Sequence, residues 1–189
     1  GRFLEEGDFL TGPYELVDLN RALPELLMSR TAFVRAGGQP RSVNIEKRFV
    51  FRPRSIDVYY KVTNLGDSEM AVRFGVEMNV SLAARNADSG RLFLLDEDRK
   101  SEITTEPQEI GGVQGLLVRD VRNEVSITLS SATPFLCWSF PLETMTPGVV
   151  DQPPVFQSHC FIQQWDLRLP AGESWENHLS VGFEKTQSA

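Results

Sequence analysis

The segment EMAVRFGVEMNVSLAA, residues 69–84, decides the fold class. Every second position in it is apolar: Met70, Val72, Phe74, Val76, Met78, Val80 and Leu82. Since successive side chains of a strand point to opposite sides of a sheet, this period of two predicts a β-strand with one face in a core. The other face carries Arg73, Glu77 and Asn79 among small residues, and its contacts bear on function.

Alternation of this kind recurs along most of the chain. We expect further extended segments at 14–19, 21–38, 42–51, 55–64, 113–120, 124–130, 134–144, 155–169 and 174–184. Residues 85–112 are less regular and indicate excursions at a sheet edge. About ten strands joined by tight turns, with almost no helical period, predict antiparallel pairing. The expected fold class is all-β: a large antiparallel two-sheet sandwich.

Length and composition favour one soluble globular domain over residues 1–189. The hydrophobic fraction of 41% is enough for a substantial core, and 24% charged residues are ordinary for a globular protein. No apolar run approaches the roughly 20 residues that a membrane helix needs. Because the first residue is glycine and not methionine, we expect the chain to be a fragment of a longer protein.

Net charge and cysteine usage limit the partners and the compartment. The chain carries a net charge of −7, and its lysines and arginines are scattered, which argues against nucleic acid as a ligand. Cys137 and Cys160 lie in separate apolar segments. We expect buried free thiols in a reducing compartment, and therefore a cytoplasmic protein.

Catalytic and metal-binding motifs are missing from the sequence. It has no glycine-rich phosphate loop, no nucleophile elbow and no closely spaced cysteine pair, so we expect neither a cofactor nor a metal. His159 and His178 are interpreted as solvated or hydrogen-bonded strand residues. The acidic cluster at 96–98 lacks the spacing of a calcium loop and is interpreted as a solvated turn.

Two sets of residues leave alternatives open. Glu77 and His159 form a general base and acid if they meet at one sugar ring, whereas the plainer reading pairs Glu77 with Arg73 on an interfacial sheet face. Trp138, Trp165 and Trp175 are either stacking platforms for sugar or core residues, and their positions inside alternating strands favour the core.

Several motifs, taken in order, resemble the C-terminal domain of glycoside hydrolase family 57 enzymes of the α-amylase/4-α-glucanotransferase type. They are EEGDFLTGPYEL, VNIEKRFVF, VYYKVTN, RFGVEMNVSL, CWSFPLET with Gln157 soon after it, and WDLRLPAGESW. The likeness runs over roughly residues 3–183, and GDFLTGPYE, FGVEMN and WSFPLET are its most specific parts. One departure is MTPGVVDQPPVF, which stands where relatives carry a loop rich in serine and glutamate.

This resemblance implies a sandwich of the galactose mutarotase kind that follows a catalytic (β/α) barrel. The family's catalytic carboxylates lie in that barrel, outside this chain, so the sandwich is implied to be accessory and to pack on it. The rival interpretations are a stand-alone glucan-binding module and a sugar-converting enzyme of the mutarotase type. The candidates for contact with carbohydrate or with the barrel are Arg73, Glu77, Asn79, His159, Gln163 and Trp165.

Overall fold

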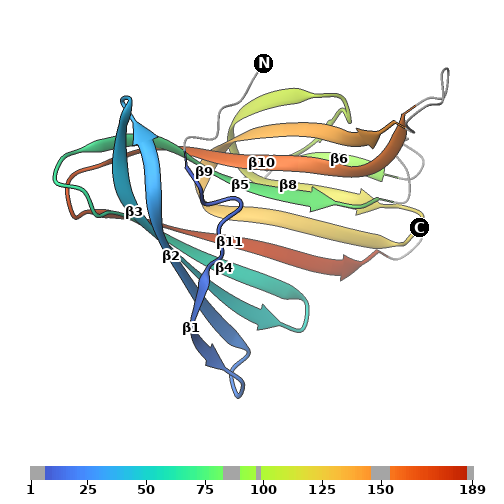
Figure 1. Cartoon of the computed structure of the whole chain (residues 1–189). Coiled ribbons are helices and arrows are strands. Elements are labelled where there is room, and N and C mark those ends of the chain that lie inside the picture. Colours follow the sequence, from blue (N-terminus) through green and yellow to red (C-terminus); the bar gives the residue numbers. More distant parts are fainter. Residues whose placement is uncertain (1–6, 83–89, 97–98, 146–153, 187–189) are drawn as a thin grey trace. The chain divides into compact units, whose positions relative to one another are not determined.

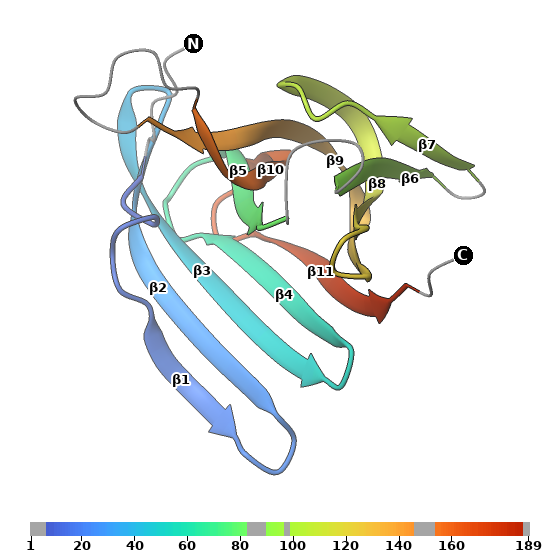
Figure 2. The same cartoon turned by 90° about the vertical axis from the view of Figure 1, so that its right-hand side faces the viewer.

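The computed structural model describes residues 7–82, 90–96, 99–145 and 154–186, and every regular element in these ranges is a β-strand. There are eleven strands in the described ranges, and Figure 1 labels all of them except β7, which Figure 2 labels. Their bounds are β1 Glu15–Asn20, β2 Glu25–Ala36, β3 Gln39–Arg52, β4 Ser55–Asn64, β5 Met70–Val80, β6 Gly90–Asp96, β7 Arg99–Ile103, β8 Gln108–Asp120, β9 Val125–Thr144, β10 Val155–Leu169 and β11 Ser174–Lys185.

The chain divides into two compact units. Unit 1 comprises Gly1–Phe74 and Asp166–Ser180, and unit 2 comprises Gly75–Trp165 and Val181–Ala189. Strands β5, β10 and β11 contribute residues to both units. In unit 1 the strand order is β1-β2-β3-β4-β11, and Figure 2 shows β1 to β4 as consecutive neighbours. In unit 2 the order is β11-β9-β8-β6-β7, while β10 pairs with β9 and β5 pairs with β10.

Strand β5 confirms the alternation that the sequence predicts. From Met70 to Val80 the even-numbered residues are buried or half-buried, and the odd-numbered ones are exposed. Strands β4 and β10 have the predicted bounds, and the pairs β1–β2, β2–β3, β3–β4, β6–β7, β6–β8, β8–β9 and β9–β10 are antiparallel. The irregular region contains the short strands β6 and β7, with β7 at the end of the strand order, as expected for an edge excursion.

One prediction about strands is wrong. Segments 124–130 and 134–144 are a single strand, β9. Its register with β8 jumps from Ser130 opposite Gly115 to Phe135 opposite Val113, so the residues between form a bulge. Pro134 lies in this bulge, where its missing N–H costs no ladder hydrogen bond. A proline therefore interrupts the pairing without ending the strand.

Each unit has its own apolar core. In unit 1, Phe74 packs edge-on against Tyr60 and Trp175, with ring centroids 5.5 and 5.6 Å apart. These aromatic rings accompany buried aliphatic residues of β2 to β4, among them Val43, Ile45 and Val62. In unit 2 the fully buried residues include Leu92, Leu116, Val118, Leu129 and Phe161, which come from β6, β8, β9 and β10. The burial of these alternating residues is what holds the strands in register.

Cys137 and Cys160 are buried free thiols in unit 2, as the sequence predicts. Burial raises the pKa of each thiol to about 12. Since only the thiolate reacts, we expect neither cysteine of the folded protein to react with a chromogenic disulfide reagent at about pH 8. In guanidinium chloride both cysteines should react at once, which provides the internal control. Rapid native-state labelling of either one would contradict their burial.

Candidate functional site

The exposed side of β5 in unit 2 forms part of a mixed polar and aromatic surface. A Cβ added at Gly75 would lie 3.6 Å from Ile162 Cγ2 and 3.9 Å from Gln164 Cγ, so Gly75 and these β10 side chains share a face. By alternation Glu77 lies on the same face, which we call the Glu77 face. Ile162 is the register partner of Trp138 in β9, and therefore Trp138 belongs to it too.

Two hydrogen bonds orient polar groups on the Glu77 face. Asn79 Nδ2 donates to Glu77 Oε1 at 2.7 Å, and both side chains are exposed. Trp138 Nε1 donates to Glu109 Oε2 at 2.6 Å, and the indole ring is half-exposed. Glu109 is in β8, directly opposite Trp138. The hydrogen bond from Trp138 to Glu109 fixes the indole ring beside carboxylate acceptors. This arrangement can bind either a hydroxyl-rich ligand or another protein surface.

Arg73 lies in unit 1 and forms a two-pronged ion pair. Its Nε donates to Asp166 Oδ1 at 2.7 Å and its Nη2 donates to Asp166 Oδ2 at 3.1 Å. This hydrogen bonding lowers the pKa of the Asp166 carboxyl, so the carboxyl stays ionised at neutral pH. Both side chains are largely exposed, so the pair contributes little to stability but fixes the guanidinium in place. Arg73 and Glu77 thus each have a partner other than the one the plainer reading gave them.

The remaining three candidates are buried in unit 2. His159, Gln163 and Trp165 alternate along β10, share the face that the sequence predicts, and are shielded from solvent. His159 Nε2 lies 2.8 Å from Ser139 Oγ, and its ring contacts Phe161 at 4.8 Å between centroids. Trp165 Nε1 donates to the carbonyl oxygen of Thr133 at 3.4 Å. The core interpretation of Trp165 is therefore the one that its surroundings favour.

Gln163 departs from the usual behaviour of buried amides. Only 1% of it is exposed, and within the described part of the chain neither its Nε2 nor its Oε1 has a hydrogen-bond partner. Such a group costs stability unless something satisfies it. In the same unit its neighbours along the face, His159 and Trp165, have the partners given above. Gln163 is accordingly an internal polar residue, removed from the Glu77 face.

Strand alternation separates Glu77 from His159. Ile162 and Gln164 are even-numbered in β10 and lie on the Glu77 face, so the odd-numbered His159 points to the other side of the same strand. A general acid and a general base must both reach one ligand. Glu77 is exposed and His159 is 0% exposed, so this arrangement does not bring the two to a common ligand.

The second histidine also has a structural environment. His178 Nε2 lies 3.3 Å from Asp57 Oδ1 in unit 1, and its ring stacks on Tyr59 with centroids 4.4 Å apart. Arg52 Nε donates to the same carboxyl at 2.6 Å, and this bond is the largest cause of the lowered pKa of Asp57. His159 is thus a hydrogen-bonded strand residue, as predicted from the sequence, and His178 is a half-buried strand residue beside a carboxylate and an aromatic ring.

Glu109 and Asp166 are the site residues that sequence reasoning missed. Each lies far from its partner in the chain: Glu109 is 29 positions from Trp138, and Asp166 is 93 positions from Arg73. Their roles depend on strand register, which single-sequence patterns do not give across such separations. The available signal for Asp166 was its position between Trp165 and Leu167 in the 155–169 pattern, because alternation places it on the side opposite these two apolar residues.

Some predictions lie outside the described residues. The cluster at 96–98 and most of the MTPGVVDQPPVF departure are among them, apart from the backbone of Asp96. Within the ranges that the structure describes, no group of three histidine, cysteine, aspartate or glutamate side chains is arranged to hold a metal ion. No helix in those ranges could span a membrane.

Solved structures share the fold of this chain. The 4-alpha-glucanotransferase from Thermococcus litoralis matches 97% of it with a TM-score of 0.70 and 17% identity. A putative aldose 1-epimerase from Escherichia coli K12 matches 92% with a TM-score of 0.64 and 12% identity. A galactose mutarotase related enzyme from Lactobacillus acidophilus matches 94% with a TM-score of 0.62 and 10% identity. At these identities the likeness establishes the fold, an antiparallel sandwich of the galactose mutarotase kind, as predicted.

The matched part is a small fraction of the first of these proteins and a larger fraction of the others. This chain spans 24% of the Thermococcus enzyme, 69% of the Escherichia coli protein and 73% of the Lactobacillus protein. No curated protein sequence matches the chain. The family model described as "Alpha-amylase/4-alpha-glucanotransferase, C-terminal" matches residues 1–179, and the chain therefore belongs to this family of C-terminal domains.

Proposed function

We propose that the chain is an accessory, non-catalytic domain of an α-glucan-processing enzyme of glycoside hydrolase family 57. In this proposal the parent is a hydrolase or a 4-α-glucanotransferase, and its catalytic barrel lies outside residues 1–189. The observation that carries it is the family membership, which covers residues 1–179. The fold shared with the Thermococcus 4-alpha-glucanotransferase supports it as well. The Glu77 face of unit 2 is the proposed contact region, and Arg73 is a separate candidate in unit 1.

The chemistry of the Glu77 face agrees with a contact role. Its carboxylates and amide are exposed and oriented by hydrogen bonds, and its acidic groups have no exposed histidine beside them among the described residues of unit 2. Polar groups around a half-exposed tryptophan are typical of the rim and core of a protein interface. If the domain contacts the substrate groove of the parent enzyme instead of the barrel surface, the Glu77 face can make that contact as well.

Assays on a defined maltooligosaccharide test this proposal. The isolated chain should neither shorten nor lengthen maltoheptaose, whereas the full-length parent should do one or the other. Chromatography of the products distinguishes hydrolysis, which gives only shorter chains, from transfer, which also gives longer ones. Turnover by the isolated chain, or a parent without a glucan-active region, would contradict an accessory role.

A glucan-binding module is the second candidate, and Trp138 is the observation that favours it. The half-exposed indole is held by Glu109, and a base or sugar ring can stack on such a platform. This candidate requires the isolated chain to be retarded in a native gel that contains amylose. It further requires Trp138→Ala to abolish the retardation while Phe33→Ala, on an exposed aromatic of unit 1, leaves it unchanged.

The mutarotase-type candidate has less support. It needs an exposed acid–base pair, and alternation points Glu77 and the buried His159 to opposite sides of their sheet. Polarimetry of freshly dissolved α-D-glucose separates it from the others. Under the proposed function, the chain leaves the spontaneous rate of anomerisation unchanged.

A further inference from the structure

On one face of the β1–β4 sheet in unit 1, the side chains become more exposed from β4 toward β1. Register places Leu19, Leu26, Phe49 and Val58 in one row across β1, β2, β3 and β4. Val58 is 7% exposed, Phe49 and Leu26 are half-buried, and Leu19 is 47% exposed. Apolar surface therefore becomes progressively uncovered toward β1.

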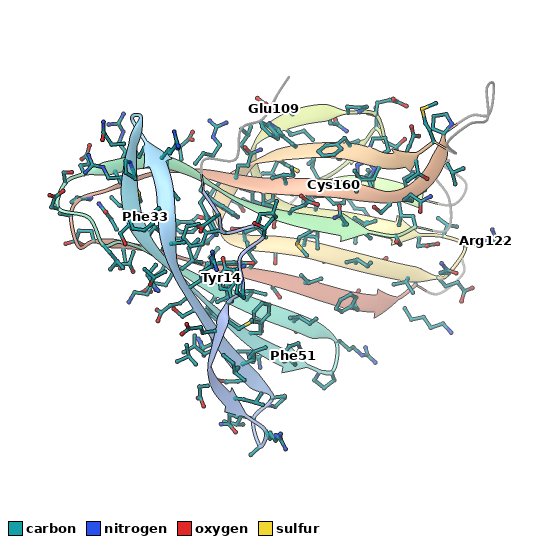
Figure 3. All side chains as sticks on the ribbon, viewed as in Figure 1. Tyr14, Phe33, Phe51, Glu109, Arg122 and Cys160 are labelled. Carbon is teal, nitrogen blue, oxygen red and sulfur yellow. The ribbon has the colours of Figure 1, made fainter. Side chains whose placement is uncertain are left out.

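The neighbouring row repeats the gradient. Leu16, Met28, Lys47 and Tyr60 are register partners in the same order of strands, and exposure rises from 8% at Tyr60 to 57% at Leu16. Phe51, two residues beyond Phe49 in β3, stacks on Phe49 at 6.3 Å and is 41% exposed. We call Leu16, Leu19, Leu26, Phe49 and Phe51 the open face. Figure 3 labels Phe51 at the end of β3.

The opposite face of the same strands is polar. Asn44 Nδ2 donates to Ser29 Oγ at 2.9 Å and to Thr31 Oγ1 at 3.0 Å, and Arg48 lies 3.8 Å from Glu25. An antiparallel sheet with one polar and one apolar face normally packs its apolar face on a second layer. Clustered exposed apolar side chains of this kind mark a surface that another molecule or segment covers.

Two observations bear on which molecule or segment covers the open face. This chain spans only 24% of the Thermococcus enzyme and 69% of the Escherichia coli protein that share its fold, so the fold occurs with additional polypeptide in both. A second copy of this chain would bring another net charge of −7 against the first, which disfavours self-association. Covalently attached polypeptide meets no such barrier, because it is present at a high effective concentration.

We propose that the open face of β1 to β3 is the surface on which polypeptide of the parent protein, outside residues 1–189, packs its own apolar side chains. This inference rests on the proposed function, since it requires a parent. It adds a second contact region, apolar and in unit 1, to the polar Glu77 face of unit 2. The occupant is an apolar layer of the same polypeptide, and neither glucan nor a second copy of the chain.

Hydroxyl-radical footprinting of two proteins tests this inference. The probes are Leu16, Leu19 and Phe51, measured in the 189-residue chain and in the full-length parent. Oxidation of all three should fall severalfold in the parent. Phe33 is the matched control, because it is 63% exposed and lies on β2 opposite Ser42, outside the open face. Its oxidation should be equal in the two proteins, and equal oxidation at the three probes would overturn the inference.

Paired variants provide a second measurement. In the full-length parent, Leu19→Ser with Phe51→Ser should lower the thermal midpoint clearly, and Phe33→Ser should not. In the isolated chain both changes should have small and similar effects. If the isolated chain forms dimers at high concentration in which Phe51 is protected, a second copy is the occupant and the inference fails.

The outcomes also separate this inference from the proposed function. A parent that processes maltoheptaose but leaves the open face fully oxidisable keeps the function and removes the inference. A parent with a covered open face and no glucan activity does the opposite.

Discussion

Replacing Phe161 with alanine should lower the free energy of unfolding by about 3–5 kcal/mol, because it removes a fully enclosed aromatic side chain. Phe161 is the largest fully buried side chain in the described residues and is 0% exposed. Its ring contacts that of His159, which is itself hydrogen-bonded to Ser139. Alanine leaves a cavity in unit 2 that these fixed neighbours cannot fill.

Urea denaturation followed by tryptophan fluorescence measures this loss as a lower midpoint with an unchanged slope. The control is Phe33→Ala, which removes the same atoms from a residue that is 63% exposed. Its effect should stay within about 0.5 kcal/mol. Equal losses for the two variants would mean that the β10 row is not the core of unit 2.

The all-β class and most strand bounds follow from alternation alone. Strand β5 illustrates why: its six apolar residues occupy every second position without a break, which predicts a strand and not a helix, and the exposed and buried sides are as predicted. Strand β10 behaves similarly, since its aligned residues from His159 to Leu169 are all buried. Local periodicity carries this information because each side chain direction depends only on its own strand.

Strand β9 shows a feature that local sequence patterns cannot predict, namely the continuity of one strand across a bulge. Its two halves look like separate strands because Pro134 stands between them, and proline is usually excluded from a paired strand. Their continuity depends on a bulge opposite β8, at Ser131 to Pro134, and thus on residues about 20 positions away. Nothing within the segment itself encodes the partner's register.

The candidate site also has features that alternation predicts and features that depend on strand pairing and packing. The exposure of Arg73, Glu77 and Asn79 is visible in their own alternation. For His159, Gln163 and Trp165, alternation establishes that they share a face, but the covering of that face depends on which strands pack over it. The Asp166 and Glu109 contacts depend on pairing between strands distant in sequence. A polar residue on a predicted face is thus a weak guide to solvent access.

The Asn64→Asp variant should be the most pH-sensitive change in the chain. Asn64 is 0% exposed, and its Nδ2 donates to the carbonyl oxygens of Ser68, Leu169 and Pro170 at 2.8, 2.9 and 3.1 Å. Its Oδ1 accepts from the N–H of Gly66 at 2.9 Å. This amide joins the turn after β4 to the turn after β10 within unit 1. Aspartate replaces the donating Nδ2 with a second carboxylate oxygen, which faces the three carbonyl oxygens.

At neutral pH the buried carboxylate should cost about 3–5 kcal/mol of unfolding free energy, since an uncompensated charge is desolvated beside acceptors. These surroundings raise the pKa of the introduced carboxyl above the unfolded value of about 3.9. A raised pKa in the folded state means that stability is retained below the unfolded value and lost as the pH rises through the folded one. The deficit relative to wild type should therefore be smallest near pH 4 and largest near pH 7, by the same linkage.

Asn20→Asp is the matched control for this variant. The Oδ1 of Asn20 accepts from the N–H groups of Ala22 and Leu23 at 3.0 and 3.1 Å, and both bonds appear on the exposed turn after β1. Aspartate can accept the same two bonds, so its unfolding free energy should stay within about 0.5 kcal/mol of wild type at every pH. Chemical denaturation of both variants across this pH range compares the loss of a buried amide donor with the same substitution on an exposed turn. If Asn64→Asp matched Asn20→Asp at neutral pH, the amide of Asn64 would not be the link between the two turns, because Asn64 differs from Asn20 in its complete burial and in the three carbonyl oxygens that face its Nδ2.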